Sequence, residues 1–79
     1  MNKFAYINTN IERIKKEIRM GLISTTVLSH YVIYSRYDYY RKLGNYVGLS
    51  VLFASDCCMV SERLVYKIIK EMEEICEYQ

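Results

Sequence analysis

The sequence has no proline and no tryptophan, and only three glycines and one histidine in 79 residues. Without proline, few positions force a break in the backbone, so long helices with short connections are expected. The glycines, Gly21, Gly44 and Gly48, are the main candidate stops. A chain of this length suffices for one domain. We therefore expect a single all-α domain over residues 1–79.

Cysteine and histidine are too few and too poorly spaced for a metal site. The cysteines are Cys57, Cys58 and Cys76, and the lone histidine is His30. Zinc sites generally use paired Cys-x-x-Cys spacing or several histidines. The cysteine count is odd, and the first eight residues lack the long apolar core of a signal peptide. These features predict a cytoplasmic protein in a reducing compartment, with buried thiols and no bound metal.

Membrane spans and catalytic motifs are also missing. A membrane-spanning helix needs about 18 apolar residues without interruption, whereas the longest apolar window, Tyr46 to Val60, is shorter and contains Asp56. No phosphate-binding loop, paired carboxylates in a glycine-rich pocket or supported Cys/His constellation is recognisable. We therefore expect no membrane partner, no cofactor, no small-molecule substrate and no enzymatic activity.

The charge is small in total but unevenly distributed. The net charge is +2. Residues 1–70 hold all eleven lysines and arginines against five acidic residues, a local charge of +6, whereas residues 71–79 hold four glutamates and no basic residue. A basic body with an acidic end suits an anionic partner for the body. Ordinary solvated helix faces followed by an acidic tail are the alternative explanation.

Helical periodicity predicts four helices, and hence a compact four-helix bundle. Residues 1–8 show no clear period and are expected to be irregular. The first helix should begin at Thr9 or Asn10, where Thr9 and Glu12 fit a capping box, and should end at Gly21. The second should run from about residue 24 to residue 43, and Gly44 and Asn45 should stop it.

The second predicted helix is rich in tyrosine and apolar on more than one face. Tyr31, Tyr34, Tyr37 and Tyr40 are spaced at helical intervals within it. A helix that is apolar on several faces is central in its bundle or is buried against a second subunit. Stacking of these rings on single-stranded bases is a weaker alternative, because such platforms usually lie on exposed sheets or grooves. We expect core packing or a homodimer interface.

Residues 49–70 predict two short helices joined by a tight turn, the layout of a helix-turn-helix. The first should span Leu49 to Cys57 or Cys58, after a connection over residues 45–48. The second should begin after Ser61, the best N-cap in the chain, and run to about Cys76.

The helix-turn-helix geometry makes specific demands on this pair. Ser55 supplies a small side chain where the helices cross. The residues expected to face inward are Ala54, Cys58, Val60, Val65 and Ile68. The turn residue, usually glycine, is Met59. A residue other than glycine is acceptable at this position if the turn avoids a positive φ angle or is slightly longer.

The stretch from Ala54 to Glu71 resembles the helix-turn-helix of bacterial and phage DNA-binding proteins, in which Val-Ser-x-x-x-Val-Tyr-x-Ile-Ile is a familiar run. The segment from Tyr34 to Gly44 is similar to the helix that leads into this module in small regulators of mobile elements. Trp-repressor-like and homeodomain-like folds share the arrangement. The resemblance implies sequence-specific binding of double-stranded DNA and transcriptional regulation by a homodimer.

If the resemblance holds, the DNA contacts belong to the exposed face of the last helix. Ser61 would offer its hydroxyl and backbone N–H to a phosphate. Arg63 would pair with guanine and Glu62 with cytosine, while Tyr66 would reach a thymine methyl or a phosphate. Lys67 and Lys70 would hold phosphates. The predicted DNA-binding residues are Ser61, Glu62, Arg63, Tyr66, Lys67 and Lys70.

A non-catalytic protein-interaction module, such as an adaptor or an antitoxin-like partner, is the main alternative. In that case the tyrosine-rich helix and the acidic C-terminus would bind another protein, and the last helix pair would serve only for packing. The two hypotheses differ in the surface of the last helix. A face from Arg63 to Lys70 that is buried, or neutralised by acidic residues, would favour the protein-interaction module.

Overall fold

Five helices make up the part of the chain that the computed structural model describes, residues 1–75. They are α1 (Lys3–Thr9), α2 (Ile11–Arg19), α3 (Thr26–Lys42), α4 (Val47–Cys58) and α5 (Glu62–Met72). The only β-type pairing among these residues is an isolated bridge between Asn2 and Ile75. The all-α prediction is confirmed, but there are five helices rather than four.

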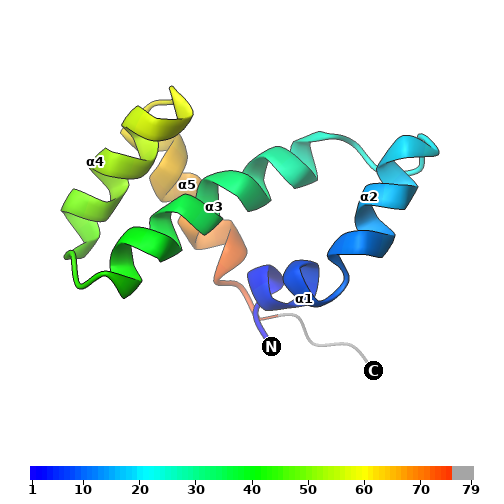
Figure 1. Cartoon of the computed structure of the whole chain (residues 1–79), viewed down its shortest axis with the longest axis horizontal. Coiled ribbons are helices and arrows are strands. Elements are labelled where there is room, and N and C mark those ends of the chain that lie inside the picture. Colours follow the sequence, from blue (N-terminus) through cyan, green and yellow to red (C-terminus); the bar gives the residue numbers. More distant parts are fainter. Residues whose placement is uncertain (76–79) are drawn as a thin grey trace.

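Helix α3 is the centre of the arrangement. It packs against α4, α5 and α1, and in Figure 1 it crosses in front of α5, with α4 at one end and α2 beyond the other. Its buried side chains are Ile33, Tyr34 and Tyr37. The Phe4 ring of α1 lies 4.6 Å from the Tyr34 ring, centroid to centroid. The prediction that the tyrosine-rich helix is central is therefore confirmed.

The core is built mainly from one apolar stripe on each helix. Ile7 of α1, Ile14 of α2, Val51 and Ala54 of α4, and Val65, Ile68 and Met72 of α5 join the three buried residues of α3. Burial raises the pKa of the Tyr34 and Tyr37 hydroxyls, and the nearby Glu73 carboxylate raises both further. Both rings therefore act as packing elements with neutral hydroxyls.

Helix α1 was not expected, and its presence changes how the next helix begins. The Asn2 side chain caps α1 by accepting a hydrogen bond from the Ala5 amide at 2.8 Å. A seven-residue helix is too short to show a convincing period. Thr9 lies inside it and donates its hydroxyl to the Ala5 carbonyl. The predicted capping box between Thr9 and Glu12 is therefore wrong.

Two further boundaries differ from the prediction. Helix α4 begins at Val47, so part of the expected connection at residues 45–48 is helical. Helix α5 ends at Met72, with Glu73 as its C-cap, rather than near Cys76. Cys76 itself lies outside the described residues.

The glycine stops are confirmed at two of the three positions. Gly21 follows α2 with φ of +78°, and Gly44 follows α3 with φ of +100°. Glycine adopts these left-handed conformations without the steric cost that a Cβ atom brings. Gly48, in contrast, lies inside α4, where the Tyr46 ring approaches it closely.

Candidate nucleic-acid interface

Helices α4 and α5 are joined by a turn of three residues, Met59 to Ser61. Small side chains on α4 allow close packing: Ala54 is fully buried and Ser55 is 7% exposed. From α5, Val65 and Ile68 are fully buried in the same core cluster. Of the positions expected to face inward, Ala54, Val65 and Ile68 are therefore buried, whereas Cys58 and Val60 are half-buried.

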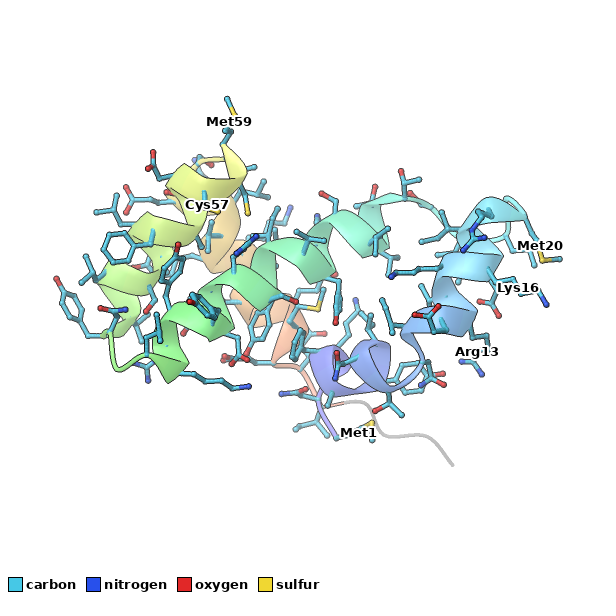
Figure 2. All side chains as sticks on the ribbon, viewed as in Figure 1. Met1, Arg13, Lys16, Met20, Cys57 and Met59 are labelled. Carbon is cyan, nitrogen blue, oxygen red and sulfur yellow. The ribbon has the colours of Figure 1, made fainter. Side chains whose placement is uncertain are left out.

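The turn takes a left-handed residue that is not glycine. Met59 has φ of 57° and ψ of 44°, and the Val60 amide donates to the Ser55 carbonyl at 3.0 Å. The condition that a residue other than glycine needs a turn without positive φ is therefore wrong, because Met59 itself takes the left-handed conformation. The side chain is 92% exposed and points away from the body (Figure 2). The backbone thus closes the turn as glycine would, at a steric cost of about 1 kcal/mol.

Ser61 begins α5, as predicted. Its hydroxyl oxygen accepts a hydrogen bond from the Leu64 amide at 3.1 Å. Since that oxygen acts as the acceptor, the hydroxyl proton is still available for donation to an outside group. Glu62 occupies the first turn, where a negative charge stabilises the positive end of the helix dipole.

All six predicted DNA-binding residues are exposed: Ser61 at the N-cap of α5 and the other five within the helix. Five of them, together with Leu64, line an open hollow of about 570 Å³; the five are Ser61, Arg63, Tyr66, Lys67 and Lys70. Glu62 is exposed but does not line the hollow. The structure therefore brings a tyrosine ring and three cationic groups together along α5, from its first turn to its last.

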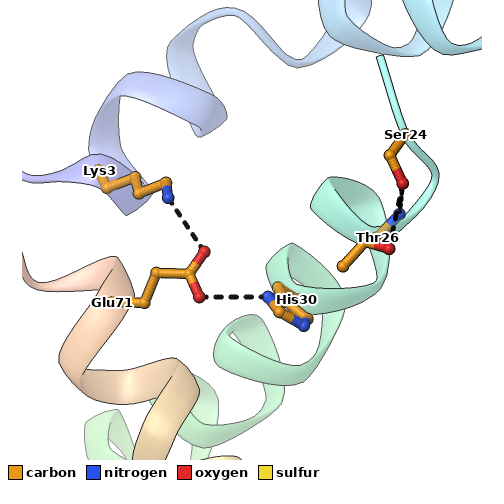
Figure 3. A network of polar contacts seen from close by, with 5 residues as sticks. All are labelled: Lys3, Ser24, Thr26, His30 and Glu71. Atoms are coloured by element: carbon orange, nitrogen blue, oxygen red, sulfur yellow. Dashed lines mark hydrogen bonds and ion pairs between the residues drawn. The ribbon is translucent and has the colours of Figure 1, made fainter.

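The cationic groups on this side of α5 are not neutralised within residues 1–75. Arg63, Lys67 and Lys70 form none of the ion pairs found there. The expected partner of Lys67 at i+4 is Glu71, but Glu71 turns toward the other side of α5. Its Oε1 lies 3.0 Å from Lys3 Nζ and its Oε2 lies 3.4 Å from His30 Nδ1 (Figure 3).

Sequence reasoning missed this three-residue network of Lys3, His30 and Glu71. It joins α1, α3 and α5, and the Lys3 hydrogen bond holds the pKa of the Glu71 carboxyl below its ordinary value. Lys3 lay in a segment expected to be irregular, so no periodicity placed it near α5. The network explains how acidic Glu71 can follow Lys67 and Lys70 without neutralising them.

A second set of basic residues lies on α2. Arg13 and Lys16 point away from the body in Figure 2. Arg13 Nε lies 3.8 Å from Glu17 Oε1, so its charge is partly compensated. The amphipathic pattern expected for this helix is confirmed, since Ile14 is buried on its opposite side.

The thiols and the histidine offer little chemistry. Cys57 is exposed and Cys58 is half-buried, so the expectation of buried thiols is wrong for Cys57. Burial, and then the Cys57 thiol, raises the pKa of Cys58. Among residues 1–75, no group of three potential metal ligands comes together. No helix in this part of the chain is long and apolar enough to cross a membrane.

Comparison with known proteins adds no family to this description. No protein-family model, curated protein or solved structure matches the chain.

Proposed function

We propose that this chain binds double-stranded DNA through α4 and α5, which would act as a helix-turn-helix, and that it regulates transcription in a sequence-specific manner. In this proposal α4 lies across the DNA backbone and α5 enters the major groove. No step of chemistry is involved. Phosphate contacts supply most of the affinity, and a few side chains of α5 supply the specificity.

One observation carries the proposal: the exposed side of α5 presents Arg63, Lys67 and Lys70 without acidic partners in residues 1–75. A face that served only for solvation would be expected to pair Lys67 with Glu71 at i,i+4 spacing. Because Glu71 is held by Lys3 and His30, the positive potential of this side is left for an outside anion. This arrangement also argues against the protein-interaction alternative for α5, which required a buried or neutralised face.

The individual roles follow from position along α5. Ser61 donates its hydroxyl proton to a phosphate at the start of the helix, where backbone N–H groups also favour an anion. Arg63 reads a guanine through two parallel hydrogen bonds, and Glu62 accepts from a cytosine amino group. Tyr66 contacts a thymine methyl or a phosphate. Lys67 and Lys70, farther along, neutralise phosphates.

The test begins with selection of bound duplexes from a random pool, followed by titration of the selected site at several salt concentrations. Arg63→Ala should reduce discrimination at one base pair by about 1–3 kcal/mol. Lys70→Ala should weaken all duplexes about equally and lower the salt slope by about one.

Lys16→Ala is the matched control, because it removes the same charge from α2, where Lys16 points away from the body. It should change affinity much less than Lys70→Ala. The proposal fails if no duplex binds at low salt, or if the Lys16 and Lys70 variants lose affinity equally.

A further inference from the structure

Helix α4 has an unusual distribution of side chains: its inward side is small and polar, and its outward side is large and apolar. Ser50, Val51, Ala54 and Ser55 are buried. In contrast, Leu52 and Phe53 are 46% and 38% exposed. A surface helix normally shows the reverse pattern. Large apolar side chains that gather on an exposed side mark an interaction surface.

The two buried serines of α4 have hydrogen-bond partners where they lie. The Ser50 hydroxyl donates to the Asn45 carbonyl at 3.3 Å, and the Ser55 hydroxyl donates to the Leu52 carbonyl at 2.9 Å. Both buried hydroxyls are therefore satisfied by nearby backbone, at no cost to the core. Rotating α4 to bury Leu52 would break this packing, so the core of the monomer cannot cover the outward apolar side chains of α4.

The apolar surface continues from α4 onto α3 through aromatic contacts. The Phe53 ring lies 5.2 Å from the Tyr40 ring, and the Tyr40 ring lies 5.3 Å from the Tyr39 ring, each measured between centroids. Val32 and Leu43, at helical spacing from Tyr39, are also exposed. We call this surface the α3–α4 face; it comprises Val32, Arg36, Tyr39, Tyr40, Leu43, Leu52, Phe53 and Asp56.

The charges on the α3–α4 face indicate which partner it fits. Arg36 on α3 and Asp56 on α4 are exposed, and neither forms an ion pair within residues 1–75. One cation and one anion are therefore left unpaired beside the apolar patch, both near the C-terminal end of α4, where Arg36, Cys57 and Cys58 line the same hollow. This pattern is complementary to itself. When a two-fold axis passes between the charges, Arg36 of each copy meets Asp56 of the other.

We infer that the α3–α4 face binds a second copy of this chain in a two-fold symmetric dimer, with Phe53 near the axis and two reciprocal Arg36–Asp56 pairs. Aromatic residues and arginine are enriched in protein interfaces, and homodimer interfaces are more apolar than the rest of the surface. The face carries one cation, whereas the exposed side of α5 carries three, so DNA is a poor occupant here. This inference does not depend on DNA binding by α5.

The size of the face is compatible with a dimer. A standard interface buries about 800 Å² per partner, about one seventh of the 5644 Å² surface of this molecule. Aromatic side chains carry about 150–250 Å² each. The exposed parts of Tyr39 and Phe53, 52% and 38%, therefore supply about 200 Å². Val32, Leu43 and Leu52 add to this area, as do the adjoining sides of both helices.

The test is a charge exchange followed by light scattering and sedimentation over a range of concentrations, without DNA. Reductant is kept throughout, because exposed Cys57 would otherwise form intermolecular disulfides. The unmodified chain should show twice its mass of 9.5 kDa. Arg36→Asp and Asp56→Arg should each weaken self-association by at least about tenfold, because each places like charges opposite one another twice.

Mixing the two variants provides the decisive arm. A chain with Arg36→Asp and a chain with Asp56→Arg should form a mixed dimer, since both reciprocal pairs regain opposite charges. Both substitutions are at exposed positions, and circular dichroism verifies that each variant is folded. A chain that remains monomeric at all concentrations would overturn the inference. So would variants that self-associate like the unmodified chain, or a mixture that does not associate.

Discussion

Helices α4 and α5 are neighbours in the chain and in space, yet they are built in opposite ways. Helix α5 buries Val65, Ile68 and Met72 and exposes charged residues. Helix α4 buries small residues, two of them serines, and exposes Leu52 and Phe53. Core packing therefore explains which side chains α5 buries and exposes, but it does not explain why α4 exposes large apolar side chains. In the two proposals above, the outward sides of the helices therefore bind different partners: an anion at α5 and an apolar surface at α4.

Truncating one apolar residue on each helix gives the largest expected effect in this comparison. Ile68 is fully buried, so Ile68→Ala should lower the free energy of unfolding by about 2–5 kcal/mol. Leu52→Ala should cost far less in the dilute, monomeric chain, because Leu52 is 46% exposed. Urea unfolding at low protein concentration measures both values. Equal losses would show that Leu52 is part of the monomer core.

The turn between the two helices offers a smaller effect. Met59→Gly removes the Cβ atom from a left-handed residue and should stabilise the chain by about 0.5–1 kcal/mol. The methionine side chain is almost fully exposed, so little packing is lost. Thermal unfolding measures the gain. Met59→Ala is the control and should bring no gain, because it keeps the Cβ atom; a similar gain from alanine would contradict the steric explanation.

The smallest effect concerns the end of α5, where Glu71 turns toward Lys3 and His30. Its pKa is lower in the folded than in the unfolded state, so its contribution to stability is present above the unfolded value of about 4.5. That contribution is lost as the pH falls below this value. Glu71→Gln should therefore destabilise the chain by less than about 1 kcal/mol at neutral pH, and it should flatten the acid limb of stability against pH. Urea unfolding between pH 7 and about pH 3 measures this; an unchanged acid limb would contradict it.

Periodicity and capping signals were enough to predict α2, α3, the start of α5 and the burial of Val65 and Ile68. These signals failed where a structural feature depends on contacts between residues that are distant in the sequence. Helix α1 is short, and it is held by Phe4 packing on Tyr34 and by Lys3 reaching Glu71, contacts that no sequence window contains. The conformational preference of methionine disfavours a positive φ angle at Met59. The packing of α4 on α5 overrides that preference.

The candidate site was partly predictable for a similar reason. Exposure of the six residues follows from the helical period of α5, which can be read from sequence. The lack of neutralisation depends on Glu71 pairing with Lys3, 68 residues away in the chain. The sequence likewise does not show that Arg36 and Asp56 lack ion-pair partners, because this depends on how α3 and α4 pack.

The contacts between the two ends of the described chain also bear on the order of folding. The Lys3 amide donates to the Glu74 carbonyl at 2.9 Å, and Asn2 pairs with Ile75. Closing a loop of this length in an unfolded chain costs on the order of 4 kcal/mol in entropy. Once α3, α4 and α5 have assembled, most of the chain between Lys3 and Glu74 is ordered, so closing this contact costs less entropy. Helix α1 is therefore expected to be the last of the five helices to reach its final position.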